Sequence, residues 1–289
     1  MNKILVPNLI IGGLPKSGTT FLYNLLSQHD EICASSVKEI ALYMSVLRKN
    51  KRPDLSLYKK YFDHYNKEKY ILEASPQYFI NTKIIAPIIR DDFSKLKLIF
   101  CFRNPTDHLF SLYKNGLRNM RIKMGTSFDE HFKKREYYPG LNNKELLLHW
   151  IKCFGENNIK VVFFENLISN TPKEITNVFN WLDIDVSNVN NLKTKNINRG
   201  GIPKSIILQR LIKHIFGAQT KEYIPHKIEV ILRKLIRFNM TEINKSSELT
   251  DEIINEINNF YHDSKIDFSN YLKNIGYYNQ LPKWLKNIP

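Results

Sequence analysis

Short apolar runs alternate with stretches of helical periodicity along the first two thirds of the chain. The apolar runs have the length expected of buried strands, and they cover residues 9–11, 32–34, 70–72, 98–102 and 160–164. Apolar residues at three- and four-residue spacing predict helices after residue 19 and over 82–89, 105–120, 142–154 and 172–182. Strands that alternate with helices indicate an α/β fold with a mostly parallel central sheet.

The pattern changes near residue 203, and from there onward it is helical. A chain of 289 residues with 43% hydrophobic and 25% charged residues fits one domain with a sizeable core. We therefore expect a single domain, with an α/β core over 1–211 and a helical C-terminal extension over 212–289.

The first predicted strand ends in a glycine turn that opens a helix. Gly12 and Gly13 follow the apolar run, the turn continues through Lys16, and the helix begins near Thr19 and Thr20. This strand–turn–helix arrangement presents backbone N–H groups to an anion, so the sequence predicts a phosphate site here.

The loop differs from the site of nucleoside triphosphatases. Gly13 and Gly18 have the required spacing, but Thr19 stands where that site needs lysine, and Lys16 lies inside the loop. The strong strand over 98–102 is followed by Arg103 instead of a magnesium-binding aspartate. The sequence therefore predicts a phosphate ligand neutralised by protein charge, without a metal.

A second predicted phosphate clamp follows the strand over 98–102. Arg103 stands at its carboxyl end, where open α/β sheets bind ligands, and Pro105 suits the first turn of a helix. Ser111 lies eight positions after Arg103, near the same face at ~100° per residue. Two phosphate sites suit a nucleotide that carries phosphates at both ends of its ribose.

These motifs together resemble those of sulfotransferases that use 3′-phosphoadenosine 5′-phosphosulfate (PAPS). The resemblance rests on residues 15–20, 103–105 and Ser111, and it is greatest to bacterial-type members related to heparan sulfate sulfotransferases. It implies a P-loop-like three-layer fold and 3′,5′-adenosine diphosphate as the product nucleotide. The implied ligands of the 5′-phosphosulfate are Lys16, Ser17, Gly18, Thr19 and Thr20. Arg103 and Ser111 are the implied ligands of the 3′-phosphate, and Lys16 is also expected to stabilise charge on the leaving oxygen.

Three further segments follow in the order expected of this family, over 37–39, 73–79 and 198–205. The first implies that Glu39 is the base that deprotonates the acceptor. The last implies a loop that covers the cofactor, with Gly201 and Lys204 as ligands. The resemblance runs from about residue 8 to residue 211.

Glu39 has a second interpretation, since a glutamate in the first turn of a helix running to Leu47 would stabilise the helix dipole. A histidine could also replace it as the base, the candidates being His64, His108, His149 and His214. His108 stands where family members often carry arginine, and it could touch the cofactor or pack against a neighbouring helix. Residues 40–43 also depart from the family's pattern, which leaves the acceptor pocket undefined.

Charge and cysteine content bear on partners and location. The net charge of +15 could steer anionic PAPS or a polyanionic acceptor, or it could be spread over solvated surfaces. No basic run of five residues occurs, so nucleic acid is not an expected partner. Three scattered cysteines favour reduced thiols and a cytoplasmic protein, and they argue against zinc. Because the first predicted strand begins within ten residues of Met1, we expect neither a cleaved signal peptide nor an N-terminal membrane anchor, and no apolar run is long enough to predict a membrane span.

The predicted function is transfer of a sulfuryl group from PAPS to a hydroxyl or amine of a glycan or a small-molecule alcohol. The oligomeric state stays open. A P-loop kinase is the alternative enzyme and would depend on magnesium. A non-enzymatic polyanion-binding protein is the other alternative, and its affinity would fall steeply with salt and survive loss of Lys16.

Overall fold

The computed structural model describes residues 5–93, 95–134, 140–194, 201–215, 235, 238–241 and 245–288. It divides the chain into two compact units. The sheet unit comprises Met1–His108, Tyr137–Ile197 and Ile257–Pro289, and the second unit comprises Leu109–Glu136 and Asn198–Glu256. The predicted boundary at residue 211 stays a prediction.

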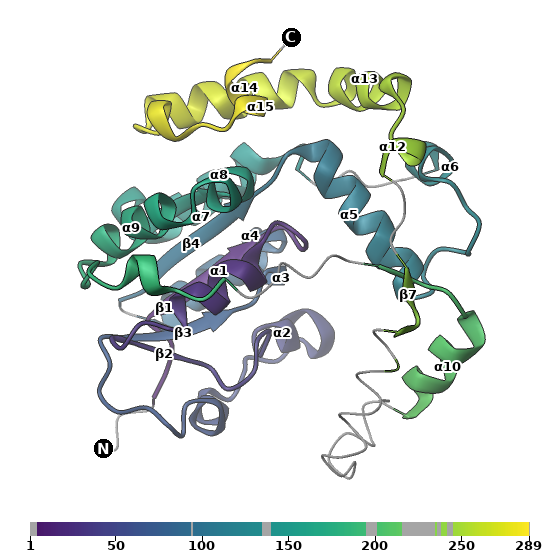
Figure 1. Ribbon diagram of the computed structural model, residues 1–289. Helices are drawn as coiled ribbons and strands as arrows, with labels where there is room; N and C mark the ends of the chain where they lie inside the picture. The colour runs from purple at the N-terminus through teal and green to yellow at the C-terminus, as the bar shows by residue number, and fades with distance from the viewer. Residues whose placement is uncertain are drawn as a thin grey trace. The chain divides into compact units, whose positions relative to one another are not determined.

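A five-stranded parallel sheet forms the centre of the sheet unit (Figure 1). Its strands are β1 (Leu9–Gly13), β2 (Ile32–Ala34), β3 (Tyr70–Ala74), β4 (Lys97–Phe102) and β5 (Ile159–Phe163). Their order across the sheet is β2-β3-β1-β4-β5, and every pair is parallel. The five strands predicted from apolar runs are thus confirmed, as is the parallel sheet. β1 lies between β3 and β4, so the carboxyl ends of these three strands are neighbours.

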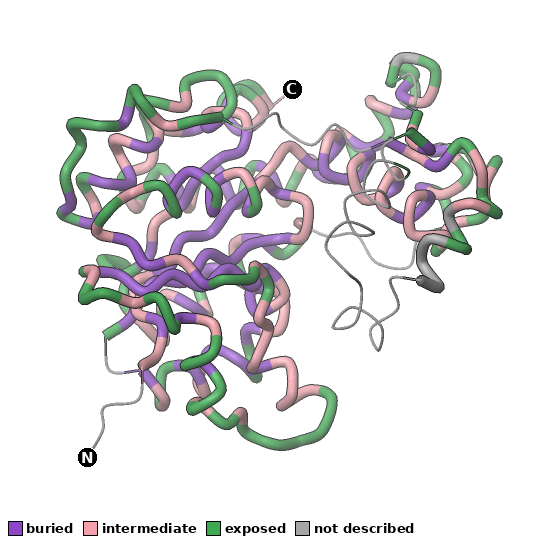
Figure 2. Tube along the Cα trace, turned by 60° about the horizontal axis from the view of Figure 1, so that its bottom comes forward, coloured by how far each residue is buried: buried purple, intermediate pink, exposed green. Residues whose placement is uncertain are grey.

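Alternate residues of each strand enter two different hydrophobic clusters, because successive side chains of a strand point to opposite faces. Leu9 and Ile11 pack on one face with residues of α1 (Thr19–Leu26) and α9 (Thr171–Leu182). Ile10 and Phe100 pack on the other with residues of α4 (Thr82–Asp92) and α7 (Asn143–Phe154). The sheet is therefore the middle of three layers, and its strands are buried along their length (Figure 2).

The C-terminal part of the chain returns to the sheet unit. Phe268 of α14 (His262–Asn274) lies 4.9 Å from Phe102 of β4, ring centre to ring centre. Ser269 Oγ donates to the carbonyl of Leu285 in α15 (Lys283–Lys286) at 2.7 Å. The last two helices thus complete the face of the sheet that carries Phe100.

Further helices complete the chain between these elements. The helices are α2 (Met44–Lys49), α3 (Gln77–Ile80), α8 (Phe164–Ser169) and α13 (Asp251–Phe260), and α5 (Pro105–Arg118) follows β4. Short 3-10 helices cover Leu55–Tyr61, Glu156–Asn158, Val189–Asn191 and Tyr278–Gln280. The boundary between the two units falls within α5 and within α13.

The second unit has an aromatic cluster of its own. Phe110 and Tyr113 of α5 meet Phe128 of α6 (Phe128–Lys133) edge to face, with ring centres 5.5 and 5.4 Å apart. The antiparallel pair β6 (Ile202–Pro203) and β7 (Met240–Thr241) precedes and follows α10 (Ile206–Ile215), and α12 spans Lys245–Glu248. The predicted helical pattern is confirmed in α10, α13 and α14, while residues 228–234 lie outside the described residues.

No helix within the described ranges combines the length and the apolar character needed to cross a membrane.

Candidate functional site

The turn after β1 requires glycine at two positions. Gly13 has φ +124°, and a Cβ there would lie 2.4 Å from the carbonyl oxygen of Cys101 in β4. Gly18 has φ +93°, and its Cβ would lie 2.3 Å from Cδ2 of Phe164. Lys16, between them, also has a positive φ of 74°. The turn therefore brings backbone closer to its neighbours than a side chain would permit, as an anion-binding loop requires.

Helix α1 begins directly after this turn, as the sequence predicts. The N–H groups of Phe21 and Leu22 donate to the carbonyl of Gly18, at 3.0 and 3.1 Å. No side chain caps this helix, and its first turn contains no acidic residue. The positive end of the helix dipole is thus not neutralised by a carboxylate of the helix itself, which favours an anionic ligand.

The predicted ligands in this turn differ in exposure. Ser17 and Thr19 are buried, at 1% and 4% exposed, Lys16 is half-buried and Thr20 is exposed. Ser17 Oγ has no hydrogen-bond partner among the described residues. A buried hydroxyl without a partner costs free energy unless a ligand or water satisfies it. The turn therefore contains a polar atom that a bound phosphate could satisfy.

Arg103 lies against the same turn. It follows β4, and its Nη1 donates to the carbonyl of Lys16 at 3.1 Å. Its guanidinium stacks on the ring of Phe164, 4.5 Å from the ring centre. Its Nε is buried and has no hydrogen-bond partner within the described parts of the chain. Burial lowers the pKa of Arg103, and an anion would compensate this desolvation.

Glu165 positions the backbone next to Arg103. Its Oε1 accepts a hydrogen bond from the N–H of Asn104 at 2.9 Å, and its Oε2 accepts one from Nε1 of Trp284 at 3.0 Å. Burial raises the pKa of Glu165, and these two donors oppose that effect. Phe164 and Glu165 were missed from the sequence, although Phe164 ends a predicted strand and Glu165 follows it, at the ligand-binding edge of the sheet.

His108 is tied to the glycine turn. It is 1% exposed, and its Nε2 lies 2.7 Å from the carbonyl oxygen of Pro15. The sequence suggests that His108 contacts the cofactor or packs against a helix. The structure shows a third role, a hydrogen bond from His108 to the glycine turn. The bond joins the first turn of α5 to the loop that precedes α1.

Glu39 lies at the same edge of the sheet, in a loop. Its N–H donates to the carbonyl of Ala74, the last residue of β3, at 3.0 Å. Its Oε1 pairs with Lys38 Nζ at 2.7 Å, and its Oε2 accepts from Gln77 Nε2 at 3.5 Å. Since Ala74 pairs with Ile11 of β1, Glu39 lies close to the strand that leads into the glycine turn.

The predicted start of the helix near Glu39 is wrong, although its later part, up to Leu47, is helical. α2 begins only at Met44, because Glu39 and Ala41 have φ values of 64° and 52°, which a right-handed helix cannot contain. Stabilisation of a helix dipole therefore does not explain Glu39.

Lys38 is the ion-pair partner of Glu39. Its side chain is 15% exposed, and its charge lowers the pKa of Cys101, which burial raises to about 12. Cys101 pairs with Gly13 across β1 and β4. The sequence names Lys38 only as part of a motif, whereas the structure pairs its ammonium group with the carboxylate of Glu39.

The alternative histidine bases bond to backbone carbonyl groups. His64 Nε2 lies 2.9 Å from the oxygen of Ala34, and His149 Nδ1 lies 2.7 Å from that of Glu145. The side chain of His214 is outside the described part of the structure.

Ser111, Gly201 and Lys204 belong to the second unit. Ser111 is a half-buried residue of α5. Gly201 is buried, and a Cβ there would lie 2.9 Å from the carbonyl oxygen of Thr241. Lys204 is exposed, with Nζ 5.3 Å from the centre of the Phe238 ring. Residues 198–200 of the predicted covering loop lie outside the described residues, and the roles of these three positions stay predictions.

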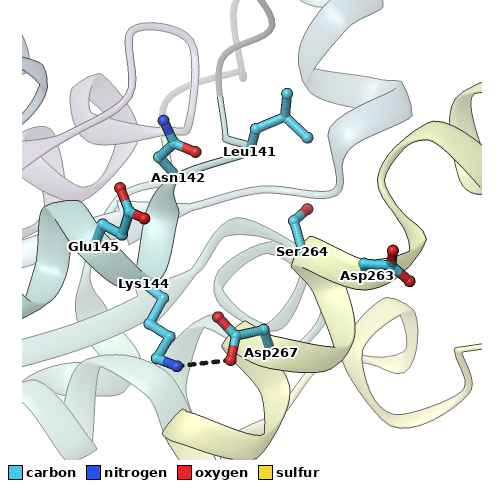
Figure 3. Close-up of a pocket in the computed structure, with 7 residues that line it drawn as sticks. All are labelled: Leu141, Asn142, Lys144, Glu145, Asp263, Ser264 and Asp267. Carbon is cyan, nitrogen blue, oxygen red and sulfur yellow. Dashed lines mark hydrogen bonds and ion pairs between the residues drawn. The ribbon is translucent and has the colours of Figure 1, made fainter.

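A cavity of about 240 Å³ lies between α7 and α14 (Figure 3). Lys144 Nζ and Asp267 Oδ1 form a 2.6 Å ion pair at its edge. None of its lining residues is a predicted site residue. Among the described residues, no group of three or more His, Cys, Asp or Glu side chains is arranged to hold a metal.

Comparison with known proteins identifies the family. The sequence profile of the sulfotransferase domain matches residues 6–268. The chain belongs to the sulfotransferase domain family. This match includes both predicted phosphate-binding motifs and the segment that carries Glu39.

Two individual sulfotransferases are similar to it. The membrane-associated sulfotransferase kil1 of Dictyostelium discoideum is 34% identical over 131 residues, which are 44% of this chain and 27% of that protein. The chain thus matches about a quarter of that relative's length. The crystal structure of a sulfotransferase from Alicyclobacillus acidocaldarius superposes with a TM-score of 0.59 at 22% identity, over 81% of this chain and all of that one. This likeness confirms the predicted P-loop-like fold.

Proposed function

We propose that this protein is a sulfotransferase that moves the sulfuryl group of PAPS to a hydroxyl or amine of an acceptor. The observation that carries the proposal is a pair of buried polar atoms, Ser17 Oγ and Arg103 Nε. Neither has a hydrogen-bond partner among the described residues, and both belong to segments that meet at the glycine turn. A nucleotide with a phosphate at each end of its ribose would satisfy both.

The residues of the sheet unit fit such a ligand. The uncapped N-terminus of α1 and the backbone of the turn would hold the 5′-phosphosulfate, with Lys16 as the cation nearest the leaving oxygen. Arg103 would hold the 3′-phosphate, since its fork of N–H donors suits a phosphate better than a lysine would. Ser111, Gly201 and Lys204 are proposed as further cofactor ligands.

PAPS supplies an activated sulfuryl group and leaves as 3′,5′-adenosine diphosphate. Glu39 would accept the proton of the acceptor hydroxyl as the acceptor oxygen bonds to sulfur and the bond from sulfur to the 5′-phosphate oxygen breaks. Lys38, paired with Glu39, would place a second positive charge beside the reacting group. The acceptor is proposed to be a glycan or a small-molecule alcohol, and the location to be the cytoplasm.

Binding of 3′,5′-adenosine diphosphate without metal tests this proposal. Calorimetry is expected to give micromolar binding to the wild type and no binding of ATP with magnesium. Arg103→Ala is expected to lower the affinity for 3′,5′-adenosine diphosphate by roughly 10- to 100-fold, because a charge-assisted hydrogen bond of about 1.5–3 kcal/mol is lost.

Two control variants separate the general effect of removing a positive charge from the specific effect of removing the Arg103 guanidinium. Arg90→Ala removes an exposed arginine of α4 that pairs with Asp91, and it is expected to leave binding unchanged. Arg103→Lys keeps the charge but not the fork, and it is expected to bind with intermediate affinity. Preference for ATP with magnesium would favour a kinase. Binding that is insensitive to Arg103 but steeply dependent on salt would favour a polyanion-binding protein.

A further inference from the structure

The loop that carries Glu39 has a backbone that needs outside support. Glu39 and Ala41 both have left-handed φ values, 64° and 52°, and neither is glycine. Such conformations are unfavourable for residues with a Cβ, and they persist only where the surroundings hold them. The support must therefore come from residues that contact the loop.

Three hydrogen bonds from the loop backbone supply that support. The N–H of Glu39 donates to the carbonyl of Ala74 at 3.0 Å. The N–H of Ala41 donates to Ser75 Oγ at 3.0 Å, and the N–H of Tyr43 donates to the hydroxyl of Tyr78 at 3.2 Å. All three acceptors belong to the end of β3 and the residues that follow it.

The two hydroxyl acceptors share one partner, the carboxylate of Glu73. Glu73 is 0% exposed, and it accepts from Ser75 Oγ at 2.6 Å and from the Tyr78 hydroxyl at 3.0 Å. A third hydroxyl, that of Tyr58, donates to it at 2.6 Å. Burial raises the pKa of Glu73, and the three hydroxyl donors oppose this effect.

The direction of these bonds matters. A hydroxyl has one proton and two lone pairs. Because Ser75 and Tyr78 give their protons to Glu73, their lone pairs remain available to the N–H groups of the loop. Oε1 of Glu73 accepts from both Ser75 and Tyr78, and Oε2 accepts from Tyr58. An apolar residue at this position would therefore remove the acceptor of both loop-facing hydroxyls, whereas a carboxamide with its nitrogen at the Oε2 position would reverse only the Tyr58 hydroxyl.

We propose that Glu73 is a positioning residue for Glu39: by accepting the protons of Ser75 and Tyr78, it keeps both hydroxyls as acceptors for the Glu39 loop. This inference rests on the proposed role of Glu39 as the base. The chain of contacts runs from the buried carboxylate, through two hydroxyls, to the N–H groups of Ala41 and Tyr43.

Tyr58 and Tyr78 offer a matched pair of variants for the test. Both are essentially fully buried, and both donate a hydroxyl to Glu73. Only the Tyr78 hydroxyl also accepts from the loop. Tyr78→Phe and Tyr58→Phe therefore delete the same atom from the same network, with and without loss of a loop contact.

The first measurement is amide hydrogen exchange at Tyr43, which needs neither cofactor nor acceptor. Tyr78→Phe is expected to speed its exchange by about 5- to 100-fold, as for loss of one hydrogen bond to a buried group. Tyr58→Phe is expected to leave it as in the wild type. Glu73→Leu, which removes the acceptor of both hydroxyls, is expected to speed exchange at Ala41, Tyr43 or both, whereas Glu73→Gln is expected to leave both rates near those of the wild type. Unchanged exchange in Tyr78→Phe, or equal acceleration in both tyrosine variants, would overturn the proposal.

The second measurement separates chemistry from binding. With radiolabelled PAPS and water as the probe acceptor, Tyr78→Phe is expected to lower kcat for sulfate release. Its affinity for 3′,5′-adenosine diphosphate should match that of Tyr58→Phe, because neither tyrosine belongs to the glycine turn. A loss of nucleotide affinity equal to the loss in kcat would contradict a positioning role.

Failure of the base assignment would be visible separately. Glu39→Gln keeps the whole Glu73 network, so its loop exchange should resemble the wild type while its sulfate release falls. If Glu39→Gln retains full activity, the proposed base is wrong, and the exchange data still decide whether Glu73 holds the loop.

Discussion

Replacing Gly18 by alanine is the most direct test of how the glycine turn, Phe164 and Arg103 depend on one another. The new methyl group would lie 2.3 Å from Cδ2 of Phe164, well inside van der Waals contact. The backbone would also keep a φ of +93°, which alanine disfavours. The aromatic ring would have to move, and Arg103 stacks on that ring at 4.5 Å.

The expected cost has two parts. A left-handed conformation costs a residue with a Cβ roughly 1–2 kcal/mol. Overpacking against the Phe164 ring adds about 1–3 kcal/mol. The free energy of unfolding should therefore fall by about 2–5 kcal/mol, and affinity for 3′,5′-adenosine diphosphate should fall with it because Arg103 loses its support.

Two further variants separate the conformational cost from the overpacking cost. The free energy of unfolding is measured in urea by circular dichroism. Gly276 has a φ of +88° and open space around its Cβ position, so Gly276→Ala should lose only the conformational part, about 1–2 kcal/mol. Adding Phe164→Leu to Gly18→Ala removes the overlap, and the double-mutant cycle should show a favourable coupling of about 1–3 kcal/mol. If Gly18→Ala costs no more than Gly276→Ala, or if the coupling is zero, the close approach does not constrain the turn.

Three other outcomes are expected. His108→Phe should lower the free energy of unfolding by about 1–3 kcal/mol, since the carbonyl of Pro15 loses its 2.7 Å partner; unchanged urea unfolding would contradict this. Iodoacetamide should label Cys153 in the native protein, while Cys33 and Cys101 should react only after unfolding. Burial raises the pKa of Cys33 to about 11 and that of Cys101 to about 12, so neither forms the reactive thiolate readily. Mass spectrometry of the labelled native protein identifies which thiols have reacted. Burial raises the pKa of Glu165 above 4.5, so the folded state binds its proton more readily than the unfolded state does. The stability of the wild type relative to Glu165→Gln should therefore fall as pH rises from about 4 to about 8, and a rise would show the opposite shift.

Much of the fold was predictable because its signals are local. Five apolar runs gave the five strands, and the alternation with helices gave the parallel sheet. Lys16, Glu39 and Arg103 could be proposed from sequence, because each belongs to a short motif or follows a predicted strand, and their roles stay predictions. Their position at one edge of the sheet follows from the parallel topology alone.

What could not be predicted depends on contacts between distant residues. Phe164 supports Arg103, and Glu165 supports Asn104, only because β5 lies beside β4. No local sequence pattern predicts that these two strands are neighbours in the sheet. The loop around Glu39 was missed for a different reason. Its backbone follows from hydroxyl groups more than thirty residues away, on Ser75 and Tyr78. The helix predicted from near Glu39 to Leu47 therefore starts later than expected, at Met44.

The glycine turn lies within the first twenty residues, but several of the residues that contact it come much later in the chain. Arg103 reaches Lys16 across 87 positions and His108 reaches Pro15 across 93. Glu165 bonds to Asn104 across 61 positions and to Trp284 across 119. During synthesis from the N-terminus, the first βα unit therefore emerges long before the partners that fix its shape, and contacts of such separation close slowly. We therefore expect the proposed nucleotide site to form late in the folding of the sheet unit, so that nucleotide binding, if it occurs as proposed, would report that this unit is folded.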